Sequence, residues 1–176
     1  MTVPDLITAR LLLRQRTMRD FQASLAMDRD PAVTQFVTGP WHDPAAHEAF
    51  VRDRIERPWA DGLGYWSIVP ARQPDRFLGW ILLIPNDGIG PDIEIGWRLI
   101  RAAWGHGHAS EAASAVVAHA FRRVGLPRII AEIDPRNTAS IGVAEKIGMR
   151  LMNETIHQDA MYRPYVMTAE DFERRR

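Results

Sequence analysis

The most informative part of the sequence is the stretch Trp97-Arg98-Leu99-Ile100-Arg101-Ala102-Ala103-Trp104-Gly105-His106-Gly107-His108-Ala109-Ser110-Glu111-Ala112. A strand predicted over residues 92–99 leads into a turn with two glycines, and a helix predicted over residues 107–124 follows. Glycine allows the backbone of such a turn to approach a ligand closely. The first N–H groups of the helix lack intrahelical partners, and the helix dipole adds positive potential. A pyrophosphate suits such a place without any lysine.

The turn lacks the signatures of two other nucleotide-binding loops. No Gly-Lys-Ser/Thr follows the glycines, which excludes the common triphosphate-binding loop. The three-glycine spacing of dinucleotide-binding folds is also missing, and no early β-α-β unit surrounds the turn. Taken by itself, the turn is equally compatible with a tight strand-to-helix connection that binds no ligand.

Hydrophobic periodicity along the chain predicts one α/β domain over residues 1–176. Short apolar, aromatic and β-branched runs predict strands at residues 9–16, 65–69, 77–84, 92–99, 128–133, 150–156 and 162–168. A 3.6-residue period predicts helices at residues 18–27, 44–58, 107–124 and 140–147. Asp43 and Pro44 have the residue types of an N-cap and a first helical position. This order predicts a mixed sheet, antiparallel in its middle, with helices on its faces.

Composition narrows the class of protein. The 176 residues include 22 basic and 22 acidic side chains, so charge gives no reason to expect nucleic acid or a membrane as partner. The absence of cysteine excludes disulfides, thiolate metal sites and a cysteine nucleophile. His106 and His108 lack the further ligands of a metal site. The N-terminus is no signal peptide, and no apolar run reaches the ~20 residues of a membrane span. We therefore expect a cytoplasmic protein without a metal.

Motifs spread over nearly the whole chain carry one family resemblance. The segment Trp104-Gly105-His106-Gly107-His108-Ala109 resembles the (Gln/Arg)-x-x-Gly-x-(Gly/Ala) pyrophosphate motif of the GNAT acetyltransferase superfamily. Together with Glu94-Ile95-Gly96-Trp97, residues 104–112 are similar to the variant of the branch that contains the ribosomal-protein N-terminal acetyltransferases. Segments 6–14, 137–140 and 145–149 are similar to that branch too. Tryptophan in place of the superfamily's Gln or Arg is usual there.

The resemblance implies a fold and a cosubstrate. It implies a mostly antiparallel, twisted sheet of about seven strands, splayed between strands four and five and flanked by about four helices. Acetyl-CoA would be the cosubstrate, with its pantetheine arm on the strand edge at Trp97, Arg98 and Leu99, and with Asn137 touching the same arm. Main-chain amides from His106 to Ser110 would hold the pyrophosphate. The loop residues implied in binding are Trp104, Gly105, His106, Gly107, His108, Ala109 and Ser110.

The same resemblance implies two catalytic residues. Glu94 stands where many members carry a base glutamate, about ten residues before the loop; alternatively, it is a solvated or ion-paired strand carboxylate. Ala144 stands where many members carry a tyrosine acid, so that group is missing here. Ser140 is the nearest hydroxyl, and in the branch a serine at this place approaches the thioester sulfur, so it counts as both catalytic and cofactor-binding. Its alternative role is a local hydrogen bond to the backbone early in a helix.

The acceptor is less defined than the cosubstrate. The resemblance implies a substrate side at residues 36–41, 59–65 and 159–165. The aromatic and acidic side chains in or near these segments are Trp41, Trp59, Tyr65, Tyr162, Tyr165, Asp43, Asp61 and Asp159. They would suit a cationic amine, but they are equally ordinary surface and core residues. A protein N-terminus, a polyamine, an amino acid and an aminoglycoside all remain open as acceptors.

Three functions fit these observations. The first is transfer of an acetyl group to a primary amine by direct attack in a ternary complex, in a monomer or a homodimer. The second is a catalytically inactive acyl-CoA-binding sensor, and the missing tyrosine keeps it open. The third is a non-enzymatic interaction domain with a vestigial loop.

Overall fold

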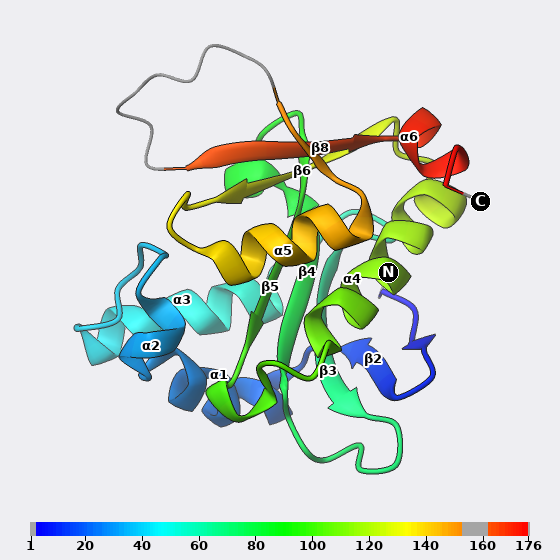
Figure 1. The fold of residues 1–176 in the computed structure, drawn as a ribbon. Coiled ribbons are helices and arrows are strands. Elements are labelled where there is room, and N and C mark those ends of the chain that lie inside the picture. Colours follow the sequence, from blue (N-terminus) through cyan, green and yellow to red (C-terminus); the bar gives the residue numbers. More distant parts are fainter. Residues whose placement is uncertain (1–2, 153–161, 176) are drawn as a thin grey trace.

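The computed structural model describes residues 3–152 and 162–175, which form one sheet with helices on both faces (Figure 1). The strands are β1 (Leu6–Ile7), β2 (Leu11–Gln15), β3 (Gly64–Pro70), β4 (Gly79–Pro85), β5 (Ile93–Leu99), β6 (Arg128–Ile133), β7 (Arg150–Leu151) and β8 (Arg163–Thr168). The helices are α1 (Phe21–Asp28), α2 (Pro31–Thr34), α3 (Pro44–Glu56), α4 (His108–His119), α5 (Thr138–Ile147) and α6 (Ala169–Glu173).

The sheet opens between its two central strands. The strand order is β1-β2-β3-β4-β5-β6-β8-β7, and the pairs on either side of the centre are antiparallel. Strands β5 and β6 run parallel, and their register consists of one pair, Glu94 with Ile130. By contrast, β5 pairs with β4 along its whole length, from Ile93 to Leu99. Beyond Glu94, the edge of β5 that faces β6 is therefore unpaired.

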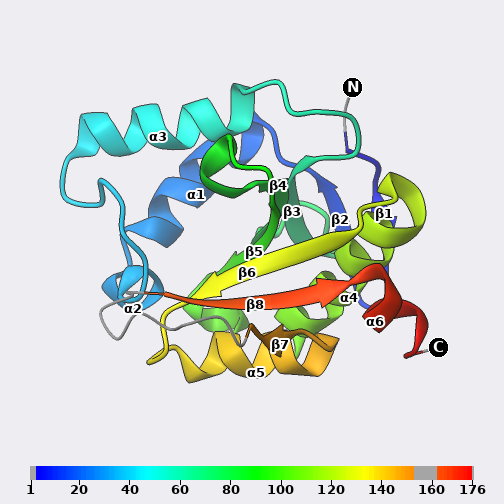
Figure 2. The ribbon, with the colours of Figure 1, turned by 90° about the horizontal axis from the view of Figure 1, so that it is seen from above.

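The helices divide between the two faces of the sheet. Figure 2 shows α1 and α3 over one face and α4 and α5 over the other. The larger core lies under α4 and α5, and its members include Trp66, Ile81, Ile95, Val116 and Ala144. A smaller cluster under α1 joins Met27 to Tyr65, Trp80, Leu82 and Ile84. Because side chains alternate along a strand, Glu94 and Arg98 share the face of α1 and α3, opposite Ile95 and Leu99.

The structure confirms the predicted sheet, including the opening between the fourth and fifth predicted strands, which are β5 and β6. Asp43 does cap α3, since its Oδ1 accepts from the N–H groups of Ala45 and Ala46. A short turn over Met18–Asp20 precedes α1, and another over Ala120–Val124 continues α4 to its predicted end.

The predicted numbers of elements were too low. The described residues form eight strands and six α-helices, instead of about seven and about four. The additions β1, α2 and α6 contain two, four and five residues, too few to show a period. Helix α1 ends at Asp28, and Pro31 then begins α2, with Asp30 capping it by accepting from the N–H of Ala32. Residues 153–156 of the strand predicted over 150–156 lie outside the described residues.

Candidate functional site

A cleft of about 630 Å³ lies where β5 and β6 separate. This volume is typical of sites that bind small molecules and cofactors. Twelve of the thirteen residues predicted for the site line the cleft, namely Glu94, Trp97, Arg98, Leu99, Trp104, Gly105, Gly107, His108, Ala109, Ser110, Asn137 and Ser140. The thirteenth, His106, stacks its imidazole on that of His108 at 5.5 Å between ring centroids. Residues up to 46 positions apart in sequence thus meet in one cleft.

The loop between β5 and α4 offers backbone N–H groups to the cleft. Gly105 and Gly107 have φ of +76° and +75°, in the left-handed region that favours glycine. The N–H groups of Gly105, His106 and Gly107 have no acceptor among the residues that the structure describes. Helix α4 begins at His108, directly after them, and its first three N–H groups have no intrahelical partner. This end of the cleft is therefore a seat for an anion.

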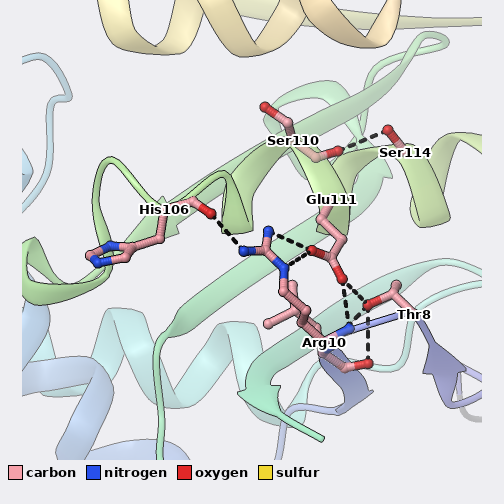
Figure 3. Close-up of polar contacts among 7 residues, drawn as sticks. Thr8, Arg10, His106, Ser110, Glu111 and Ser114 are labelled. Carbon is pink, nitrogen blue, oxygen red and sulfur yellow. Dashed lines mark hydrogen bonds and ion pairs between the residues drawn. The ribbon is translucent and has the colours of Figure 1, made fainter.

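Two side chains fix the shape of this loop. The indole Nε1 of Trp104 donates to the carbonyl of Leu99 at 2.9 Å, so that carbonyl is not available to a ligand. Arg10, which directly precedes β2, donates from its Nη1 to the carbonyl of His106 at 2.9 Å (Figure 3). Hydrogen bonds from these two side chains to main-chain carbonyls therefore hold the loop at both ends.

Glu111 anchors the arginine that holds the loop. Its carboxylate accepts from Arg10 Nε at 2.7 Å, from the backbone N–H of Arg10 at 2.9 Å and from the Thr8 hydroxyl at 2.6 Å (Figure 3). Desolvation opposes ionisation, but these hydrogen bonds hold the pKa of Glu111 below its ordinary value. The positive charge of Arg10 therefore balances the negative charge that Glu111 places near the anion seat.

Glu94 lies half-buried on β5, at the point where the strands separate. Burial raises the pKa of its carboxyl, and the charges of Glu132 and Asp87 raise it further, whereas Arg54 lowers it; the result is about 7. The ion pair with an arginine that was considered from the sequence is absent among the described residues. A carboxylate with a pKa near neutral pH is suited to accept a proton from a substrate.

Helix α5 brings Asn137 and Ser140 to the cleft. Asn137 is the N-cap of this helix, and its Oδ1 accepts from the backbone N–H of Ser140 at 3.1 Å. The Ser140 hydroxyl makes no hydrogen bond with the described residues. The local hydrogen bond considered as its alternative role is made by the backbone N–H of Ser140 instead. Ala144, at the place of the missing tyrosine, is fully buried and offers the cleft no polar group.

Only some of the residues predicted for the acceptor side line the cleft. Tyr65, Tyr162 and residues 36–38 line the cleft, whereas Trp41 packs its ring against the Arg98 guanidinium at 4.9 Å. Tyr165 is instead buried in the hydrophobic core, and the partly buried Trp59 packs against that core. Asp43 caps α3, Asp61 is exposed away from the cleft, and Asp159 lies outside the described residues.

The sequence-based interpretation missed six charged residues that line the cleft, namely Arg16, Asp28, Arg54, Asp87, Glu132 and Asp134. Arg16 and Asp28 are only 3% and 2% exposed. Asp28 accepts from Arg98 Nη1 at 2.7 Å, and its other oxygen lies 3.3 Å from His47 Nε2. A charge at the end of a strand or helix is usually solvated, so the sequence carried no signal of burial.

Comparison with known proteins decides the family. A family model described as an acetyltransferase (GNAT) domain matches residues 10–150. The chain belongs to the GNAT acetyltransferase family. The GNAT chain is 32% identical over 143 residues to YnaD of Bacillus subtilis strain 168, named as an uncharacterized N-acetyltransferase, with 81% of each chain covered. It is 35% identical over 147 residues to YkkB of the same organism, covering 82% of this chain and 84% of YkkB.

A solved structure gives the same assignment. The crystal structure of an acetyltransferase from Agrobacterium tumefaciens strain C58 is 29% identical to the GNAT chain, with a TM-score of 0.80 and 95% of each chain covered. The family and fold expected from the motifs are therefore confirmed, while the narrower branch stays a prediction. The described residues contain no group of three or more metal-ligating side chains. In the same part of the chain, no helix is both long and apolar enough to cross a bilayer.

Proposed function

We propose that this GNAT chain transfers an acetyl group from acetyl-CoA to a primary amine by direct attack in a ternary complex. One observation carries the proposal: the anion seat formed by the N–H groups of residues 105–110 and the proton-accepting Glu94 open into the same cleft. A sensor that only binds acyl-CoA needs the seat but has no use for a carboxylate with a pKa near 7. Glu94 therefore favours the enzyme over the inactive alternative.

The cleft fits acetyl-CoA at two separate places. The loop N–H groups suit its pyrophosphate, as argued above. The unpaired edge of β5 beyond Glu94 suits the amide groups of the pantetheine arm, which can pair with it like an added strand. The N–H and C=O of Arg98 face β4, and Trp104 occupies the Leu99 carbonyl, so we assign this pairing to the N–H and C=O of Trp97 and the N–H of Leu99. When bound, acetyl-CoA supplies an activated acyl group in the form of a thioester.

Two residues of the chain would handle the protons. An amine attacks only in its neutral form, so Glu94 takes a proton from the ammonium group of the acceptor, directly or through one water. Ser140 donates a hydrogen bond from its free hydroxyl toward the departing sulfur. A serine hydroxyl is a weak acid, so its role is to stabilise the negative charge on the sulfur and to relay a proton from water. Ser140 and this water together take the place of the missing tyrosine.

Titration calorimetry with acetyl-CoA, followed by a screen of primary amines, tests the proposal. Release of CoA is followed with a thiol reagent, which gives no protein background because the chain has no cysteine. Micromolar binding with turnover of an amine supports the proposal. Binding without turnover of any amine supports the sensor, and failure to bind at millimolar concentration contradicts both.

Replacing Glu111 by glutamine should weaken acetyl-CoA binding by about 10-fold, because it removes charge-assisted hydrogen bonds, worth about 1.5–3 kcal/mol each, from Arg10. Arg10 then holds the His106 carbonyl less firmly, and the loop loses part of its preorganised shape. Calorimetry measures the change in Kd. Glu170→Gln, which also removes one exposed ion-paired carboxylate, is the control and should leave Kd unchanged.

Replacing Ser140 by alanine should lower kcat about 10-fold or more with little change in KM for acetyl-CoA, as expected for a group that acts mainly in the transition state. Steady-state kinetics measures both constants. Thr138→Ala removes an exposed hydroxyl from the same helical turn outside the cleft and should leave both unchanged. Equal kinetics for Ser140→Ala and the wild type would contradict the assigned role.

A further inference from the structure

A buried guanidinium without an ion-pair partner lines the cleft on the side of α1 and α3. Arg16 directly follows β2, and its backbone N–H donates to the Tyr65 carbonyl at 3.0 Å, which fixes its position beside the sheet. Its side chain is almost fully buried but belongs to the cleft wall. The Nε has no hydrogen-bond partner, and among the described residues the guanidinium makes no hydrogen bond and no ion pair; Asp28 and Asp20 act on it only at longer range.

The neighbours of Arg16 are rings and a second guanidinium. The Arg16 Cζ lies 5.3 Å from the Tyr65 ring centroid and 5.7 Å from that of Trp80. The Arg98 Cζ lies 5.0 Å from the same Trp80 ring. Two buried carboxylates act on Arg16: Asp28 is hydrogen-bonded to Arg98, and Asp20 is paired with Arg14. Together, the three arginines therefore carry one positive charge more than the two carboxylates balance.

An uncompensated buried cation is unfavourable unless something pairs with it. The cation–π contacts with Tyr65 and Trp80 stabilise the charge but give its N–H donors no oxygen acceptor. Burial lowers the pKa of Arg16 to about 10, so the side chain remains charged at neutral pH. A cleft wall with a charged, donor-rich and unmatched guanidinium is complementary to an anion that enters with the substrate.

We propose that the acceptor carries a carboxylate in addition to its amine, and that Arg16 binds this carboxylate. The inference rests on the proposed acetyl transfer and names the substrate class of the same site. Guanidinium and carboxylate match in shape and can form two parallel hydrogen bonds. Glu94 then faces the ammonium end of the acceptor, while the carboxylate lies against Arg16. The site is thus built for an amino acid or a longer ω-amino acid.

The test compares each amino acid with its own carboxamide, which keeps the size and removes the charge. The probes are glycine, phenylalanine, 4-aminobutyrate and 6-aminohexanoate, which also vary the spacing between amine and carboxylate. CoA release gives kcat/KM for each acid and amide. For at least one pair, we expect the wild type to favour the acid by about 10-fold or more, the factor given by ~1.4 kcal/mol of an ion-paired contact.

The variant Arg16→Met should remove this preference by raising KM for the acid, with the amide affected little. Arg19→Met, which removes an exposed arginine three residues away, should keep the preference. Because Arg16→Met removes a buried charge without a partner, its melting temperature should be unchanged or higher. A marked fall in melting temperature with equal losses for acids and amides would make Arg16 structural and overturn the inference.

The remaining outcomes separate this inference from the proposed function. Equal use of acids and amides by the wild type overturns the carboxylate site and leaves acetyl transfer in place. Turnover of polyamines without turnover of any amino acid likewise overturns the carboxylate site and leaves acetyl transfer in place. A protein that binds acetyl-CoA but acetylates no amine overturns the carboxylate site together with acetyl transfer.

Discussion

Replacing Gly107 by glutamate should abolish acetyl-CoA binding in calorimetry, with Kd rising by about 100-fold or more. The new carboxylate stands among the N–H groups that suit the pyrophosphate, and losing one or two charge-assisted hydrogen bonds of about 1.5–3 kcal/mol each is enough for this factor. The Cβ itself fits, because its nearest neighbour would be Arg10 Nη2 at 3.4 Å. The glutamate would also compete with Glu111 for Arg10 and so loosen the loop.

Gly125→Glu is the matched control for backbone strain. Gly125 caps the far end of the same helical segment with φ +73°, and nothing lies within 4 Å of a Cβ placed there. In both variants a residue with a side chain must adopt a left-handed backbone conformation, which destabilises each of them by a similar ~1–2 kcal/mol. Loss of binding in Gly107→Glu alone supports the anion seat. Micromolar binding by Gly107→Glu, or loss in both variants, would contradict the assignment.

The anion seat, to which we assign the cosubstrate, could be predicted because its chemistry is local. The seat consists of main-chain N–H groups, and two glycines followed by a small-residue helical pattern are enough to indicate where those groups become available. The opening between β5 and β6 could not be predicted in this way, because the spacing of residues in the sequence does not show that two strands diverge. It was expected from the resemblance, and the single pairing of Glu94 with Ile130 bears it out.

The acceptor side was less predictable because it depends on packing between distant segments. Residue type pointed to aromatic and acidic side chains, yet Trp59 and Tyr165 pack in the core. Two of the charges that line the cleft, Arg16 and Asp28, come from the ends of β2 and α1 and are buried only after those elements meet β3–β5. A sequence gives no local sign of such burial, so the carboxylate contact proposed at Arg16 had no counterpart among the sequence-based expectations.

The environment of Glu94 also could not be derived from its position in the motif. The sequence placed it on a strand about ten residues before the loop, which is compatible with a solvated side chain. Its raised pKa requires burial together with Asp87 and Glu132, which come from the turn after β4 and from β6. This combination allows a test in which catalysis and stability change in opposite directions.

Replacing Glu94 by glutamine should lower kcat/KM by about 10²–10⁴-fold, the contribution of a general base. Only the ionised carboxylate accepts a proton, so wild-type kcat/KM should rise with pH and level off above the pKa of about 7. The variant should lose this limb of the pH profile. As a control, Glu132→Gln removes a neighbouring negative charge, and it should keep activity while moving the limb to lower pH.

The same substitution should stabilise the fold at high pH. The pKa of Glu94 rises from an ordinary value of 4.5 to about 7, so between these pH values the folded state binds more protons than the unfolded state. Wild-type stability therefore falls as pH rises through this window. Glutamine does not titrate, so urea unfolding should show Glu94→Gln more stable relative to wild type at pH 8 than at pH 4, by roughly 1–3 kcal/mol. A variant without this pH-dependent gain would show that Glu94 is not held with a raised pKa, whereas unchanged kcat/KM in the variant would place the base elsewhere in the cleft.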